Sequence, residues 1–551
     1  MWSTHVERLE KRLFPGLRDG KGFRYSRGPM TLISEFAASV ERHRNKTALF
    51  WGDREYAYSE LLALSHATAC RLQDHFKVKP GDRVGLWLKN CPEFITAFLG
   101  ILQADAVVVP INNFLKPDEV NFILNDAGID VLVTDAELGA HHRALEAARP
   151  RLQLLKVENL CPPAAGECTA VPASRASGAL TAPKGGHSEP PHDQVPSSSL
   201  AVLIYTSGTT GRPKGAMLSH ANLLHNVESC RIVLRTVAAD RMVVLLPLFH
   251  SYMLTVGMLL PLLIGGSMVL VKSVHPVRNV LQEIIQRQAT ILPAIPQLYR
   301  SMANAAIPVP LPLRLCISGA APLPKQILAE FEARFHIPLI EGYGLSEASP
   351  VVTKNPLDGT RKPGSIGLPI PGVEVSIQDD QGRELGIDQV GELCVRGGNV
   401  MLGYWNQPAE TAKVMRNGWL LTGDIGYRDL EGYYFITDRK KDMLLVNGIN
   451  VYPREIEEVL YQFPGVKEAA VVGELDARKG EHPVAFVSIN DDAVYDEAAL
   501  QQFLRHKLAD YKIPRKIALL PALPRNGTGK VLKTLLRESL GSGVRSVERG
   551  S

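Results

Sequence analysis

The chain has 551 residues, of which 45% are hydrophobic and 21% are charged, an ordinary globular composition. These values exclude a mostly disordered, collagen-like or disulfide-scaffold chain, and the length predicts more than one structural unit. Lys plus Arg number 61 and Asp plus Glu number 57, so the net charge of +4 gives no electrostatic case for nucleic acid as the main partner.

The cysteines and the apolar runs bear on the compartment. The seven cysteines lack CxxC or His pairing, which is typical of reduced thiols in a cytosolic protein and offers no zinc site. Glu7 and Glu10 interrupt the N-terminal stretch, so we expect no secretory signal. The longest apolar run, 253–264, is shorter than the roughly 20 residues of a membrane span and is predicted to be a buried helix. We expect a cytoplasmic protein, with peripheral membrane contact left open.

The first part of the chain alternates predicted strands and helices. Strands are predicted at 83–89, 106–111 and 130–135, with one helix after Pro92 and another over 117–127. Such alternation predicts α/β layers built on largely parallel sheets.

A segment rich in Pro, Ala, Gly and Ser, residues 161–198, interrupts this alternation. It has almost no large apolar residues and cannot bury enough surface to offset the entropy of ordering, so we predict a mobile surface loop or linker. A strand at 199–205 follows it at once. The pattern then resumes with further predicted strands at 242–247, 268–272, 289–293 and 313–318.

The C-terminal part has a different pattern. A charged stretch at 438–442 precedes a helix that begins after Pro453, strands at 468–473 and 482–489, and a helix at 496–508. This predicts a compact α+β unit that is large enough to be an independent domain.

A Gly-rich loop follows the strand at 199–205. Its sequence, YTSGTTGRPKG over 205–215, combines glycines, hydroxyl side chains and Lys214. Backbone N–H groups, hydroxyls and an ammonium group suit a polyphosphate. The loop is not a Walker A motif, because Gly215 follows the lysine where that motif has Ser or Thr. The alternative is a turn without a ligand.

Three further stretches suit a nucleotide. In EGYGLSEASP (341–350), an aromatic residue between glycines can lie flat against a purine, and Glu347 can hold Mg²⁺ beside phosphates. In WLLTGDI (419–425), Asp424 can accept two ribose hydroxyl donors. A second Gly-rich turn, PRNGTGK (524–530), presents Lys530. Taken alone, each is also compatible with an ordinary turn or a solvated charge.

These motifs together resemble the adenylate-forming superfamily of acyl-CoA synthetases, luciferases and adenylation domains. The nearest branch is the long-chain fatty acyl-CoA synthetases, and the resemblance runs from about residue 30 to 535. It implies an α/β fold whose large N-terminal AMP-binding domain, 1–437, has parallel sheets layered with helices plus a distorted barrel. A hinge at 438–442 and a small mobile α+β C-terminal domain, 443–551, would follow.

The resemblance also assigns roles at the nucleotide. It implies that Tyr343 stacks on adenine, that Ser346 contacts phosphate, and that Glu347 and Thr206 hold magnesium. Asp424 and Arg439 would hold the ribose. The remaining expected nucleotide contacts are Ser207, Gly208, Thr209, Thr210, Gly211, Lys214, Gly319, Ala320, Ala321, Gly342 and Gly344.

Four residues are implied in the chemistry of the acyl group and in domain movement. Lys530 would reach the substrate carboxylate and the α-phosphate, and Lys441 would be the pivot of the small domain. The region of Gly448 would approach the pantetheine thiol. His250, in the motif PLFHSY, would lie against the acyl carboxylate and gate its channel, with 253–264 as pocket wall. The alternative is that this histidine and that helix belong to the plain core.

The implied activity uses ATP, Mg²⁺ and CoA. A fatty acid would be converted to an acyl-adenylate with release of pyrophosphate, and transfer to CoA would then give acyl-CoA and AMP. An acyl-AMP ligase that loads a carrier protein, an aryl-CoA ligase, and a catalytically silent nucleotide- or acyl-binding protein stay open as alternatives. The acyl chain length and the oligomeric state, a homodimer included, are also open.

Overall fold

The computed structural model describes most of the chain between residues 30 and 541. The ranges 161–197, 207–212, 306–309, 447–448, 477–479 and 491–492 lie outside the description, as do residues 494, 527 and 528. The segment predicted to be mobile, 161–198, therefore falls outside the described residues except for Ser198.

The first sheet has the strand order β6-β5-β3-β4-β7-β8. Its strands pair in parallel except for β7 and β8, which form an antiparallel pair. β4 and β5 are buried along their whole length, as expected where helices cover both faces of a parallel sheet. The strands are β3 (Arg83–Leu86), β4 (Val107–Pro110), β5 (Val131–Thr134), β6 (Gln153–Lys156), β7 (Leu200–Thr206) and β8 (Lys214–Ser219).

The second sheet has the order β15-β14-β13-β12-β11-β9-β10-β1-β2. Its middle strands are parallel, and the outer pairs at both ends are antiparallel. The strands are β1 (Thr47–Trp51), β2 (Arg54–Ala57), β9 (Arg241–Val244), β10 (Ser267–Leu270), β11 (Ile291–Ala294), β12 (Leu315–Ser318), β13 (Leu339–Gly344), β14 (Val351–Lys354) and β15 (Leu368–Pro369).

An antiparallel sheet, β16-β17-β19-β18 with β20 beside β19, forms a half-barrel next to these two. A fourth sheet, β22-β21-β24-β23 with β25 beside β24, belongs to the C-terminal part. The strands of the third sheet are β16 (Val373–Gln378), β17 (Gly391–Gly397), β18 (Met415–Arg416), β19 (Trp419–Arg428) and β20 (Tyr434–Arg439). Those of the fourth are β21 (Leu444–Val446), β22 (Ile449–Val451), β23 (Val466–Asp476), β24 (Gly480–Ile489) and β25 (Lys516–Leu519).

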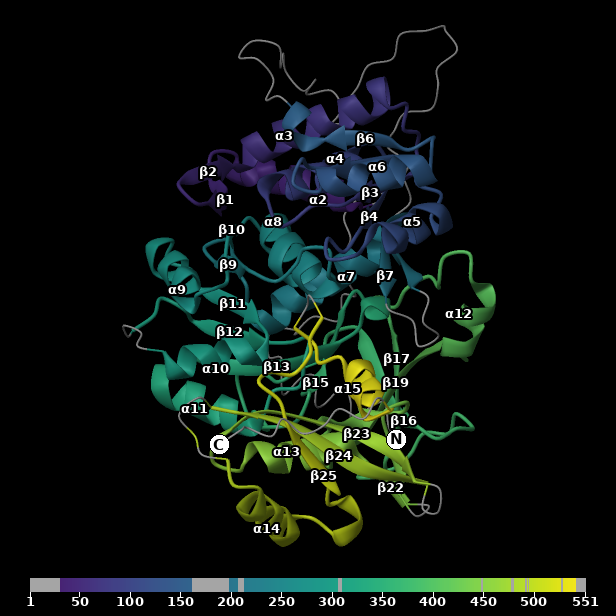
Figure 1. Cartoon of the computed structure of the whole chain (residues 1–551). Coiled ribbons are helices and arrows are strands. Elements are labelled where there is room, and N and C mark those ends of the chain that lie inside the picture. The colour runs from purple at the N-terminus through teal and green to yellow at the C-terminus, as the bar shows by residue number, and fades with distance from the viewer. Residues whose placement is uncertain are drawn as a thin grey trace, which may run out of the picture.

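Helices cover these sheets and confirm the predicted α/β class. Figure 1 shows the first sheet and its helices above the second sheet, with the C-terminal sheet below. The described helices up to residue 264 are α2 (Leu32–His43), α3 (Tyr58–Cys70), η1 (Arg71–His75), α4 (Pro92–Gln103), α5 (Pro117–Asp126), α6 (Gly139–Ala148), η2 (Val157–Asn159), α7 (His220–Leu234), η4 (Met253–Leu259) and α8 (Leu260–Ile264). The later ones are α9 (Val277–Gln286), α10 (Pro296–Asn304), α11 (Lys325–Phe335), η5 (Ser346–Ala348), α12 (Pro408–Val414), α13 (Pro453–Tyr461), α14 (Glu497–Lys507), η6 (Asp510–Lys512) and α15 (Lys533–Gly541).

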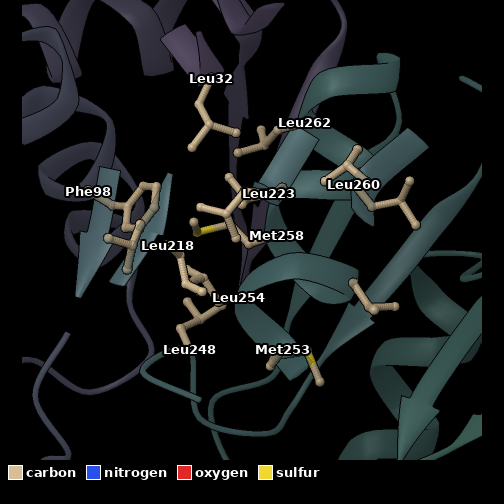
Figure 2. Close-up of a cluster of buried hydrophobic side chains, with 14 of the residues drawn as sticks. Leu32, Phe98, Leu218, Leu223, Leu248, Met253, Leu254, Met258, Leu260 and Leu262 are labelled. Atoms are coloured by element: carbon tan, nitrogen blue, oxygen red, sulfur yellow. The ribbon is translucent and has the colours of Figure 1, made fainter. Parts of the chain in front are cut away.

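The apolar run 253–264 is a buried helix, as predicted, but its first half, η4, is π-helical and only α8 is α-helical. Figure 2 shows Met253, Leu254 and Met258 of η4 pointing into one cluster with Leu223 of α7 and Phe98 of α4. Each large side chain buried in this way contributes about 1.5–3 kcal/mol to folding. The cluster joins the first two sheets into one core.

Candidate functional site

The two ends of the Gly-rich loop are fixed by strand pairing. Thr206 ends β7 and Lys214 begins β8, and the two residues are cross-strand partners in the antiparallel pair. The expected phosphate contacts from Ser207 to Gly211 lie outside the described residues. The strands therefore hold Thr206 and Lys214 side by side at the base of the loop.

Glu347 lies directly beside Thr206. The Thr206 hydroxyl is 3.4 Å from Glu347 Oε1, and the Tyr404 hydroxyl donates a hydrogen bond of 2.9 Å to the same oxygen. Burial, and then the charge of Glu347, raise the pKa of Tyr404 far above its usual range, so this hydroxyl stays a donor. Tyr404 thus fixes the orientation of the carboxylate that the sequence assigns to magnesium.

These oxygen donors fit Mg²⁺. The ion takes oxygen ligands in octahedral geometry, keeps several waters and commonly uses one or two carboxylates plus substrate phosphates. Glu347 and Thr206 supply such oxygens at the base of the loop. Within the described ranges, no group of three or more His, Cys, Asp or Glu side chains could bind a metal by itself.

Lys214 is held by an ion pair that the sequence analysis missed. Its ammonium group pairs with Glu410 of α12, and the side chains are only 10% and 23% exposed. The ammonium also lies 5.3 Å from the centre of the Tyr404 ring. Lys413 pairs with the other Glu410 oxygen, and hydrogen bonds from both lysines lower the pKa of Glu410 to about 2. Glu410 is therefore ionised, and it neutralises the charge of Lys214 in this structure.

A second group of residues joins β13 to the half-barrel. The Tyr343 hydroxyl donates to Asp424 Oδ2 at 2.5 Å, and Arg439 Nε lies 3.2 Å from Asp424 Oδ1. Asp424 and Arg439 are cross-strand partners in β19 and β20, which explains why these distant residues meet. The structure thus brings together the expected adenine residue and both expected ribose residues.

Close packing explains the glycines beside Tyr343. A Cβ on Gly344 would lie 2.2 Å from the Pro350 carbonyl oxygen, and one on Gly342 would lie 3.1 Å from the Thr353 carbonyl oxygen. Ser346 is partly exposed, and its hydroxyl is 3.0 Å from the hydroxyl of Ser251. The two glycines therefore allow the backbone around Tyr343 to pack directly against the neighbouring backbone.

The segment after β12 lies against the same region. A Cβ on Gly319 would come within 3.0 Å of the Tyr252 ring, and the Gly319 amide donates to the Ala294 carbonyl at 3.1 Å. Ala320 has a φ of 64°, a left-handed conformation that is strained for alanine. Ala320 and Ala321 keep exposed surface at the end of the strand. Packing against Tyr252 therefore requires a glycine at position 319, whereas the two alanines that follow it are not packed tightly.

Lys530 approaches this region from the far end of the chain. Desolvation, and then the positive charge of Arg439, lower the pKa of Lys530 to about 8, although the side chain keeps accessible surface. Burial, and then the charge of Lys530, lower the pKa of His250 to about 4. The His250 Nδ1 accepts a hydrogen bond from the Tyr252 amide at 3.3 Å. His250 is thus neutral near pH 7, and the charge of Lys530 contributes to this.

The remaining expected residues lie at the junction with the C-terminal part. Lys441 is exposed in the turn after β20, and its charge also lowers the pKa of Lys530. Gly448 lies outside the described residues, between β21 and β22. The turn carrying Lys441 therefore connects the half-barrel with the sheet that precedes the Lys530 loop.

The sequence analysis did not predict that Tyr404, Glu410 and Glu341 would contribute to the candidate site. Glu341 is buried and accepts a hydrogen bond of 2.9 Å from the Leu323 amide, and burial raises its pKa to about 7. Arg454 of α13 lies 3.9 Å from it. Tyr404 and Glu410 occur in a stretch without charge runs, and the glycines before Tyr404 do not by themselves indicate a ligand, so the local sequence does not single these two residues out.

Comparison with known proteins accounts for this arrangement. Residues 36–405 match the AMP-binding enzyme family, and residues 455–530 match the AMP-binding enzyme C-terminal domain. The chain therefore belongs to the AMP-binding enzyme family. Its enzyme class is acyl-CoA ligase, AMP-forming: an acid is activated with ATP and Mg²⁺ as acyl-adenylate and then transferred to CoA.

Two sequence relatives and two solved structures illustrate the likeness. A long-chain-fatty-acid–CoA ligase of Bacillus subtilis is 35% identical over 538 residues, which is 92% of this chain and 94% of the relative. A feruloyl-CoA synthase of an Amycolatopsis species is 34% identical over 505 residues, 90% of this chain and 96% of the relative. The anthranilate CoA ligase AuaEII with anthranoyl-AMP has a TM-score of 0.83 and 28% identity, covering 94% of this chain and 98% of that one. An O-succinylbenzoate coenzyme A synthetase of B. subtilis, with ATP and magnesium ion, has a TM-score of 0.79 and 28% identity, with coverages of 92% and 99%.

The helices of the structure can be tested against the thickness of a membrane. Across the part of the chain that is described, no helix is long and apolar enough to cross a lipid bilayer.

Proposed function

We propose that the acid activated by this enzyme is a fatty acid. Activation of a carboxylate is supported by Lys530, whose positive charge acts on His250 and whose own pKa responds to the charges of Arg439 and Asp424. The observation that carries the fatty acyl class is a likeness in sequence. The likeness to the long-chain-fatty-acid–CoA ligase of B. subtilis over 92% of this chain supports the fatty acyl class.

The first half-reaction is an electrostatic problem. The substrate carboxylate must approach the α-phosphate of a polyanion, and at 4 Å two unit charges repel by about 4 kcal/mol at an effective dielectric near 20. Lys530 lies between the carboxylate and the α-phosphate and offsets this repulsion. No side chain acts as a general base, because the nucleophile is already ionised. Catalysis is therefore positioning and charge stabilisation.

The other residues hold the nucleotide. Tyr343 stacks on the adenine, while Asp424 and Arg439 hold the ribose, and the loop from Thr206 to Lys214 holds the phosphates. Lys214 leaves Glu410 when a phosphate takes the place of that carboxylate. Bound at Glu347 and Thr206, Mg²⁺ would neutralise charge on the phosphate oxygens.

The second half-reaction needs a different arrangement of the chain. The small domain, 443–551, turns on Lys441 within the hinge 438–442 relative to the large domain, 1–437, and withdraws Lys530. The strand edge around Gly448 then approaches the adenylate, and the CoA thiol displaces AMP. We assign the arrangement in which the charge of Lys530 acts on His250 to the first half-reaction.

One assay tests the proposal. AMP release is measured with saturated fatty acids of graded length, ferulate and anthranilate, each with and without CoA. We expect CoA-dependent AMP release that is highest with one of the longer fatty acids. Activity with aryl acids alone would contradict the fatty acyl assignment, and adenylate accumulation without any CoA dependence would favour transfer to a carrier protein. An absence of acid-dependent AMP and pyrophosphate release would indicate a silent binding protein.

An aryl acid is the second candidate substrate. It is favoured by the likeness to a feruloyl-CoA synthase over 90% of this chain, at an identity of 34%. The acid panel separates the two candidates. The kcat/KM for a fatty acid should exceed that for ferulate if the enzyme is a fatty acyl ligase, and it should be smaller if the enzyme is an aryl ligase.

A further inference from the structure

The turn that carries Lys530 is built on one carboxylate, that of Glu468 in β23. Arg525 Nη2 donates to Glu468 Oε1 at 2.8 Å, and the Leu523 amide donates to Oε2 at 3.1 Å. The Glu468 side chain is only 12% exposed. Although burial opposes ionisation, the charge of Arg525 lowers the pKa of Glu468, so the carboxylate is charged. Glu468 thereby anchors the backbone at Leu523, just before the turn, and the side chain of Arg525 within it.

The same arginine fixes the other end of the turn. Arg525 Nη1 donates to the Gly529 carbonyl, and the Lys530 amide donates to Asn526 Oδ1 at 2.9 Å. Gly529 has a φ of +85°, which closes the turn just before Lys530. The position of the Lys530 backbone therefore depends on Arg525 and, through it, on Glu468.

Glu468 also contacts the large part of the molecule. Gln297 Nε2, from the first turn of α10, donates to Glu468 Oε1 at 2.5 Å. One turn further along α10, Arg300 donates to the backbone carbonyls of Lys467 and Val466, the second at 2.8 Å. A Cβ on Gly529 would lie 2.6 Å from Ile295 Cδ1, so the turn itself packs against the start of α10. The beginning of α10 is thus a docking surface for the Lys530 turn.

This docking surface is rigidly connected to the proposed nucleotide site. α10 follows β11 directly, and the last residue of β11, Ala294, accepts the Gly319 amide hydrogen bond. Figure 1 shows the yellow segment before α15 rising between the C-terminal sheet and the second sheet, where α10 lies. Docking on α10 therefore sets the position of Lys530 relative to Gly319.

We propose that Glu468 is a positioning residue for Lys530, and that Gln297 and Arg300 form the latch that docks it for the first half-reaction only. The proposal rests on the proposed function, because it assigns the latch to adenylation. The contacts join α10 of the large domain to β23 of the small domain in the present arrangement, which we assign to the first half-reaction. Rotation about Lys441 must break them before the thiol can reach the adenylate. Weakening the latch therefore slows adenylation and spares transfer.

Three variants test the latch: Arg300→Ala, Gln297→Ala and Glu468→Gln. Two rates are measured, acid-dependent exchange of pyrophosphate into ATP, and thioester formation from a supplied acyl-adenylate and CoA. Since a hydrogen bond to a charged group is involved in each, we expect exchange to fall by about tenfold while thioester formation is unchanged or faster. Arg300→Lys, which can still donate to one carbonyl, should recover part of the exchange rate.

Two matched controls exclude a general effect of substitution. Glu474→Gln removes a carboxylate of the same strand that pairs with Lys516 and His482, and Gln326→Ala removes a side chain of α11 that bonds to Glu330. Both should leave the ratio of the two rates unchanged. Equal loss of both half-reactions in the latch variants, or no change in either, would overturn the proposal.

Hydrogen exchange of the full-length protein, followed by mass spectrometry, is a readout that does not need activity. Amides of α10 and of the segment 520–532 should exchange faster in the latch variants than in the wild type and in Glu474→Gln. Unchanged protection in both segments would overturn the latch even if the enzyme were inactive. An inactive wild type with the expected change in protection would instead contradict the proposed function.

Discussion

At the scale of single residues, the candidate site depends on polar side chains whose partners lie far away in sequence. Tyr343 meets Asp424, Thr206 meets Glu347, and Lys214 meets Glu410. The first two pairs join residues that the sequence analysis had singled out separately. The third could not be predicted, because Glu410 becomes important only when α12 folds against the base of the loop.

The first prediction concerns the charge of Lys530. Its pKa is lowered to about 8, so the ammonium form that stabilises the developing charge is lost as the pH rises through this value. The kcat/KM for ATP in pyrophosphate exchange should therefore fall above about pH 8. His250, whose pKa is lowered to about 4, stays neutral over that range and does not contribute.

The Lys530→Arg variant supplies the check. Arginine stays protonated throughout the range, since its pKa exceeds about 12. Its exchange activity should be lower than that of the wild type but should no longer fall near pH 8. The same decline with pH in Lys530→Arg would show that another group is responsible.

The second prediction concerns Tyr404. Tyr404→Phe removes the hydroxyl that donates to Glu347, and the carboxylate then loses an orienting hydrogen bond. Because hydrogen bonds to charged groups contribute about 1.5–3 kcal/mol, the free Mg²⁺ concentration for half-maximal exchange should rise by about tenfold or more. A titration of exchange activity with Mg²⁺ at fixed ATP measures this.

Tyr433→Phe is the matched control, since the Tyr433 hydroxyl bonds to the Thr360 carbonyl instead. Its Mg²⁺ requirement should equal that of the wild type. If Tyr404→Phe lowered the maximal rate without changing the Mg²⁺ requirement, Tyr404 would not act through Glu347.

At the scale of elements, the alternation of strands and helices was predicted correctly because buried parallel strands are continuous apolar runs. β4 and β5 are examples, and so is the parallel pair β11 and β12. The run 253–264 was predicted to be helical, but its π-helical half was not. A π-turn depends on how the helix packs against α7 and α4, and the apolar composition of the run is the same for either helix type.

The third prediction concerns the turn after β20. Lys441 is exposed between Arg439, the last residue of β20, and β21. Proline at this position fixes φ near −65° and should hinder the rotation that the second half-reaction needs. A penalty of about 3 kcal/mol in the rotated state corresponds to a reduction of roughly 100-fold in thioester formation. Pyrophosphate exchange should remain close to that of the wild type.

Two other variants serve as controls for Lys441→Pro. Lys441→Ala removes the charge but leaves the backbone free, so it should form the thioester normally. Lys530→Ala should have the opposite profile to Lys441→Pro, with exchange reduced by about 10²–10³-fold and thioester formation from a supplied adenylate preserved. Normal thioester formation by Lys441→Pro would remove the evidence for a pivot there.

At the scale of the whole molecule, the α/β class could be predicted, whereas the way the two parts of the chain meet could not. The sequence presents Lys530 in a Gly-rich turn but contains no signal for what the turn touches. Its partners on α10, Gln297 and Arg300, have ordinary helical neighbours and become recognisable only through their contacts with β23. Contacts between distant segments depend on shape complementarity, which a local pattern does not encode.

The most direct test of the account follows the oxygen atoms. A fatty acid labelled with ¹⁸O in both carboxylate positions is incubated with enzyme, ATP, Mg²⁺ and CoA. If the carboxylate attacks the α-phosphorus and the thiol then attacks the acyl carbon, the AMP carries one labelled oxygen and the acyl-CoA keeps the other. Mass spectrometry should show this single label in AMP. Unlabelled AMP, or ADP as the nucleotide product, would contradict adenylate formation.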